Sequence, residues 1–218
     1  MPLQNLAKSP ILFATLSLGY ILLAIIAVSS AATILLIPVK SFILLLVILN
    51  LLAENIILAF GQSLENRNLL IRLSKVRYLL HALSTPMLLP LSLYILNING
   101  SDNFFAVEVI TWIVSIGWIL LSLSISFRKL NLRLQHDGEI YRYININKSG
   151  QPYFKIALIL LILIYLGVGL ALYSSFGLLI IAGAIAILVG NGLSRKLGIV
   201  TSNIGEFLFM SSLTIVMS

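Results

Sequence analysis

Three ionisable side chains interrupt otherwise apolar stretches of this 218-residue sequence. Glu54 lies in "LNLLAENIILAF", His81 in "RYLLHALSTP" and Glu206 in "TSNIGEFLFM". Ionisable groups are rare and costly inside membrane segments, so each is treated first as a functional candidate. Two carboxylates and one imidazole suit three tasks: relaying protons, holding a cation, or binding a polar headgroup.

Neutral polar residues accompany these three along the chain. Asn50 lies one turn before Glu54 on the same helical face, and Asn203 shortly precedes Glu206. The predicted binding site consists of Glu54, His81, Glu206, Asn50, Asn55, Asn203 and Thr85. We expect Glu54 to be its principal charge. The competing interpretation is that these groups only hold helices together, at about 0.6 to 2 kcal/mol for each hydrogen bond.

The composition of the chain indicates that these residues lie in a membrane protein. The chain is 60% hydrophobic and 10% charged, whereas about a quarter of the residues in a soluble domain are charged. A helix needs about 20 apolar residues to cross a bilayer. Runs of this kind predict one all-α transmembrane domain over residues 1–218, with spans near 10–36, 41–60, 78–97, 104–126, 156–174, 176–191 and 199–217. A six-helix protein is the alternative, because Glu206 weakens the last run and the sixth and seventh spans are short.

Loop charges predict the orientation of this seven-helix polytopic membrane protein. With the spans above, thirteen of the fourteen Lys and Arg residues fall on one side and only Lys40 on the other. Because Lys and Arg collect in cytoplasmic loops, we expect a cytoplasmic N-terminus and an outside C-terminus. This bias accounts for the positive net charge, so anionic inner-leaflet lipid, and not nucleic acid, is the expected partner of the basic loops. The particular membrane and the oligomeric state stay open.

Two of the cytoplasmic segments are longer than tight turns. Residues 61–77, "GQSLENRNLLIRLSKVR", fit either a short interfacial helix or an extension of a neighbouring span. The loop at 127–155 contains Asp137-Gly138 between strand-like residues. This pattern predicts a small cytoplasmic β-hairpin between the fourth and fifth helices.

Two prolines mark the third span. Pro86 and Pro90 lack an N–H group, which leaves the carbonyls of Ala82 and Pro86 without their usual donors. Such carbonyls either line a binding site or accept a hydrogen bond from a Ser or Thr hydroxyl.

Periodicity in the later spans predicts helix packing. In the fourth span a polar stripe at helical spacing should face the bundle: Glu108, Thr111, Ser115, Ser122 and Ser126. In the fifth and sixth spans, small residues four apart predict a tight helical hairpin: Gly167 with Ala171, and Ala182 with Ala186. Those two spans carry few strongly polar groups, so we expect them to form a wall and not a site.

Missing residue types argue against several chemistries. The chain has no cysteine, no HExxH motif, and only two aspartates, Asp102 and Asp137, both in predicted loops. We therefore expect no metal or cofactor.

Together these patterns predict a polar site in the cytoplasmic half that binds or transports a small polar solute, a cation or a proton. An enzyme is less expected. The alternatives are a lipid-modifying enzyme with His81 or Glu54 as general base, and a non-catalytic scaffold that contacts its partners through the basic loops.

Overall fold

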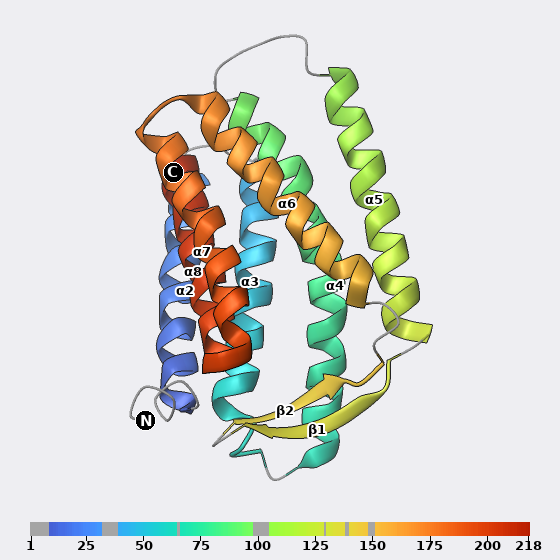
Figure 1. Ribbon diagram of the computed structural model, residues 1–218. Helices are drawn as coiled ribbons and strands as arrows, with labels where there is room; N and C mark the ends of the chain where they lie inside the picture. The colour runs from blue at the N-terminus through green and yellow to red at the C-terminus, as the bar shows by residue number, and fades with distance from the viewer. Residues whose placement is uncertain are drawn as a thin grey trace.

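The computed structural model describes residues 9–31, 39–64, 66–97, 105–128, 130–137, 140–147 and 151–218. Within these residues it contains seven helices and one pair of strands (Figure 1). In chain order they are α2 (Pro10–Ala31), α3 (Val39–Phe60), α4 (Arg67–Asn97), α5 (Phe105–Arg128), β1 (Leu132–Asp137), β2 (Ile140–Asn145), α6 (Gln151–Leu172), α7 (Ser175–Leu197) and α8 (Val200–Met217).

The protein is an all-α polytopic membrane protein. All seven described helices are long and apolar enough to cross a bilayer. The shortest, α8, has 18 residues and includes Glu206; at about 1.5 Å per residue it still nearly matches a hydrocarbon core about 30 Å thick. Seven spans are therefore favoured over the six-helix alternative.

Three helices extend by five residues or more beyond the predicted bounds. One of them is α6, which begins at Gln151 and not at residue 156. The third span was expected at 78–97, but α4 begins at Arg67, so residues 67–77 extend this span and do not form a separate interfacial helix. Leu70 and Ser74 in this extension are buried, because it packs under the strands. The sixth span was expected to be short at 176–191, whereas α7 continues to Leu197. Residues 32–36 of the predicted first span lie outside the described part of the chain.

The helices form a closely packed group with one outlying member. Helices α2, α3, α7 and α8 lie together, α6 crosses them obliquely, and α5 stands apart on the far side of α4 (Figure 1). The closest packing is between α7 and α8, and α2 packs on both α3 and α8. The largest core cluster joins residues of several helices, among them Tyr20, Ile48, Leu91, Tyr165 and Leu213.

The strands β1 and β2 pair antiparallel beneath one end of the bundle, beside the start of α2, while the end of α8 lies at the opposite end (Figure 1). Leu132 pairs with Asn145 and His136 with Tyr141; the connecting residues 138 and 139 lie outside the described part. On β2, Ile140 and Tyr143 are buried against the ends of the helices. The strands therefore pack on the bundle.

Glycines permit the closest helix contacts, but at positions other than those predicted. Helices α6 and α7 do meet, through Gly169 and Gly177, whereas Gly167 has open space beside it. Ala171 and Ala182 are exposed. The predicted small-residue pairing is therefore wrong in its residues, because spacing along a helix does not reveal which face meets the neighbour.

Gly205 on α8 is the clearest of these close approaches. A Cβ atom at this position would lie 2.5 Å from the carbonyl oxygen of Ala186 on α7. We predict that Gly205→Ala lowers the melting temperature in detergent and costs about 1 to 3 kcal/mol, because the two helices must move apart. The matched control is Gly192→Ala, which meets no atom within 4 Å. Equal effects of the two substitutions would contradict the close packing of α7 on α8.

Candidate functional site

A cavity of about 250 Å³ lies between α3, α4, α5, α6, α7 and α8. Most of its wall is apolar, and Leu51, Trp118, Leu161 and Phe209 belong to it. The polar residues that line it are Asn50, His81, Ser84, Thr85, Ser122, Lys155, Asn191 and Glu206. A mostly apolar wall with a few polar groups is the usual character of a small-molecule site. Four of the seven predicted site residues therefore border one cavity: Asn50, His81, Thr85 and Glu206.

Asn50 presents an unsatisfied acceptor in this wall. Its Nδ2 donates a 2.8 Å hydrogen bond to the hydroxyl of Ser84, which joins α3 to α4. Its Oδ1 is buried and accepts no hydrogen bond. A buried acceptor without a donor costs about 1 to 3 kcal/mol. Asn50 itself lines the cavity, so this acceptor belongs to a residue of the cavity wall.

Glu206 is the acidic group of the cavity. No basic side chain in the described part of the chain forms an ion pair with it. The Ser202 hydroxyl, one turn earlier, lies close to Glu206 and donates to Oδ1 of Asn191 at 3.0 Å. The cavity wall therefore contains an acidic side chain that has no ion-pair partner among the described residues.

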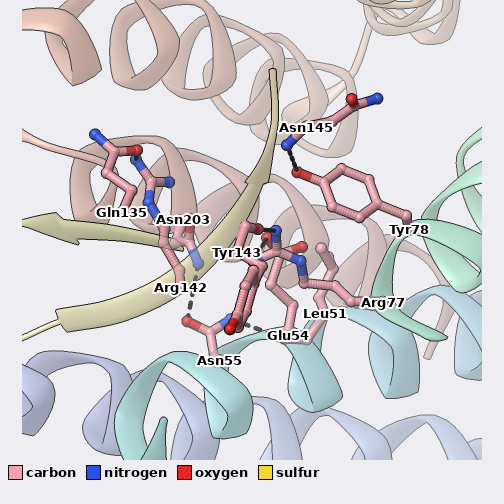
Figure 2. A network of polar contacts seen from close by, with 10 residues as sticks. All are labelled: Leu51, Glu54, Asn55, Arg77, Tyr78, Gln135, Arg142, Tyr143, Asn145 and Asn203. Atoms are coloured by element: carbon pink, nitrogen blue, oxygen red, sulfur yellow. Dashed lines mark hydrogen bonds and ion pairs between the residues drawn. The ribbon is translucent and has the colours of Figure 1, made fainter. Parts of the chain in front are cut away.

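Glu54, the predicted principal charge, has a different environment. Its Oε1 lies 3.8 Å from Nη1 of Arg77, and the two side chains are 15% and 7% exposed. Nη2 of the same guanidinium donates a 3.1 Å hydrogen bond to the carbonyl oxygen of Tyr143 on β2 (Figure 2). Glu54 is not among the residues that line the cavity. Its charge is compensated, and the ion pair connects α3, α4 and the strands.

Asn55 and Asn203 join two helices. Nδ2 of Asn203 donates to Oδ1 of Asn55 at 3.1 Å, and Nδ2 of Asn55 donates to the carbonyl oxygen of Leu51 at 2.8 Å (Figure 2). Both asparagines are buried, and neither lines the cavity. Their contacts hold α8 against α3, as the competing interpretation of the polar residues expects.

The carboxylates of Glu54 and Glu206 nevertheless lie within electrostatic range of each other. The hydroxyl of Tyr20 on α2 is within range of both. It is fully buried and has no hydrogen-bond partner. His81, in contrast, is an exposed residue at the edge of the cavity. The structure thus brings the two carboxylates near each other and leaves His81 peripheral.

A contact between α4 and α5 shows where one of the carbonyls left without a donor by the prolines finds its hydrogen bond. The hydroxyl of Ser115 on α5 donates to the carbonyl oxygen of Pro86, one of the two acceptors predicted to lack a donor. Nearer the other end of the helices, the Tyr94 hydroxyl donates to Oε1 of Glu108 at 2.9 Å. Ser115 and Ser122 are buried, so this part of the polar stripe faces the bundle. The side chain of Ser126 lies outside the described part.

Sequence reasoning missed three residues of this region. Arg77 was counted as a loop cation, Lys155 as another, and Asn191 was assigned to a wall helix. The available signal for Asn191 was an amide between two glycines in "VGNGLS". For Arg77 the available signal was its position four residues before His81, which places the two side chains on the same face of the helix.

No protein-family model, curated protein or solved structure matches this chain. Among the described residues, no three His, Asp or Glu side chains come together in a way that could hold a metal ion.

The Arg77–Glu54 pair should show strong coupling in a double-mutant cycle. We predict that Arg77→Gln lowers stability in detergent by about 3 kcal/mol, because it leaves a largely buried carboxylate without its cation. Adding Glu54→Gln should recover part of this loss, since the unpaired charge is then removed. The measurement is the melting temperature of the two single variants and the double variant. Additive losses would show that the two groups do not interact.

Proposed function

We propose that the protein binds a small solute with a protonated amine, or another cationic hydrogen-bond donor, and carries it across the membrane. The observation that carries this proposal is a cavity lined both by Glu206, which has no ion-pair partner among the described residues, and by Asn50, whose Oδ1 accepts no hydrogen bond. An ammonium group has several donors and a positive charge. It therefore complements both groups at once.

The apolar wall favours such binding. Charges interact more strongly where water is excluded, so a solute cation beside Glu206 gains more than it would at a surface. The proposal keeps the predicted class of polar solute, cation or proton, but transfers the main role from Glu54 to Glu206. The enzyme alternative has less support, because His81 lies at the exposed edge of the cavity.

Substituting Glu206 tests this proposal. We predict that methylammonium or ethanolamine raises the melting temperature of the purified protein. At a hundred times its Kd, the ligand should stabilise the fold by about 2.7 kcal/mol. Glu206→Gln should abolish this shift and the flux of the same solute into liposomes. The matched control is Glu108→Gln, which removes a carboxylate bonded to Tyr94 away from the cavity. No shift with the unmodified protein, or an unchanged shift in Glu206→Gln, would refute the proposal.

We also propose that the strand end of the bundle faces the cytoplasm, with the N-terminus inside and the C-terminus outside. Support comes from the thirteen basic residues expected on one side and from the position of the strands and the start of α2 at the same end (Figure 1). The basic loops then lie against anionic inner-leaflet lipid, which attracts Lys and Arg.

Single cysteines test the orientation, since the chain has none of its own. His136→Cys lies on β1, and Tyr173→Cys lies between α6 and α7, where the native side chain is 98% exposed. We predict that a membrane-impermeant maleimide labels them from opposite sides of sealed vesicles, with Tyr173→Cys reached from outside. Labelling of both from one side would contradict the orientation.

A further inference from the structure

A second cavity, of about 320 Å³, lies beside the first, between α4, α5 and α6. Its lining is almost entirely apolar, and Val114, Leu121, Ile156 and Leu160 in that lining are each at least half exposed. Because exposed apolar residues of a spanning helix face lipid, this groove is open to the hydrocarbon region.

The helices on either side of the groove do not close it. Helix α5 packs on α4, and α6 packs on α7 and α4, but the described residues of α5 and α6 make no substantial contact with each other. The two ribbons stand apart over much of their length (Figure 1). The groove is also continuous with the polar cavity, because Trp118, Ser122 and Leu161 line both.

The polar cavity contains charges of both signs. Lys155 and Glu206 both line it, and neither forms an ion pair within the described part of the chain. Lys155 is exposed, whereas Glu206 is partly buried. Separate, unpaired charges of opposite sign complement a ligand that itself carries both signs.

We propose that the solute is a zwitterionic amphiphile that enters sideways from the membrane, an inference that rests on the proposed function. Its acidic group binds Lys155, and its amine binds Glu206 and Oδ1 of Asn50. Its alkyl chain occupies the groove between α5 and α6.

Other occupants fit this groove less well. A transmembrane helix, about 10 Å across with its side chains, is too wide for a hollow of this volume. A purely polar solute would gain little from the groove, whose lining has only Ser122 and Tyr153 as polar residues. An alkyl chain matches both the volume and the apolar character of the groove.

Photolabelling tests the position of the chain. The probe is dodecylphosphoethanolamine with a diazirine near the end of its chain, applied to the purified full-length protein in nanodiscs, with adducts mapped by mass spectrometry. We expect adducts on the groove residues of α5 and α6. Ala157→Trp, which fills the groove, should reduce them to background. The matched control Leu163→Trp, at an exposed position of α6 outside the lining, should not. Adducts spread evenly over all lipid-facing helices, or unaffected by Ala157→Trp, would overturn the proposal.

Competition tests the two charges. Unlabelled dodecylphosphoethanolamine should displace the probe at a concentration at least about tenfold below that of dodecanol or free phosphoethanolamine. Lys155→Gln and Glu206→Gln should each weaken this displacement by about tenfold or more, as expected for lost hydrogen bonds to charged groups. Equal displacement by dodecanol, or no effect of Lys155→Gln, would overturn the zwitterionic assignment.

The outcomes for the two proposals are distinguishable. If ethanolamine binding depends on Glu206 but is unchanged by Ala157→Trp, and no groove adduct forms, then the proposed function holds and the amphiphile inference is overturned. If neither ethanolamine nor the amphiphile shows any dependence on Glu206, both are overturned.

Discussion

The lack of water in the bilayer interior governs this structure, because each buried polar group there must find its partner within the protein. Most of the hydroxyls bond to carbonyls of their own helix, as Ser17 does to Phe13. Other contacts connect different helices instead, among them Asn50 with Ser84, Asn203 with Asn55, Ser115 with Pro86, and Tyr165 with Leu88. Against this background, the unsatisfied Oδ1 of Asn50, hydroxyl of Tyr20 and hydroxyl of Ser74 are exceptions. Asn50 lines the same cavity as Glu206, and Tyr20 lies within electrostatic range of Glu206.

The ion pair between Arg77 and Glu54 affects the second carboxyl group of this region, Glu206. Glu54 and Glu206 are close enough to interact, and two bare carboxylates at such positions would repel each other. Arg77 neutralises Glu54 and is itself held by the carbonyl of Tyr143. The strands, which pack on the ends of the helices, therefore help to hold Arg77 in place beside Glu54. With Glu54 paired to Arg77, Glu206 is the one acidic residue in the described part of the chain that lines the cavity.

The sequence predicted the parts of this architecture that depend on position along a helix. Apolar runs predicted the seven spans, and distance from the helix ends placed Glu54 and Glu206 at a similar depth. In the structure the two side chains lie within electrostatic range of each other. What a single sequence lacks is the rotation of each helix about its axis. That rotation turns Asn50 toward the cavity and Glu54 toward Arg77, although the two lie one turn apart. The extension of α4 to Arg67 was ambiguous for a related reason: its burial comes from packing under the strands, which no apolar window records.

The way α5 packs on α4 determines on which side the cavity is open. Two polar contacts hold this helix to α4, from Ser115 to Pro86 and from Tyr94 to Glu108, and the first exists because Pro90 has no N–H group to bond with the Pro86 carbonyl. Since α5 packs on α4 and makes no substantial contact with α6 among the described residues, the side of the cavity between α5 and α6 is left without a protein wall. In a membrane, lipid chains fill that side. A carboxylate in a cavity bounded partly by lipid is screened less than one in a water-filled channel, so its need for a cationic partner is greater. Pro90 leaves the carbonyl oxygen of Pro86 free to accept from Ser115 on α5. It thus helps to hold α5 on α4, beside a cavity that opens toward the bilayer.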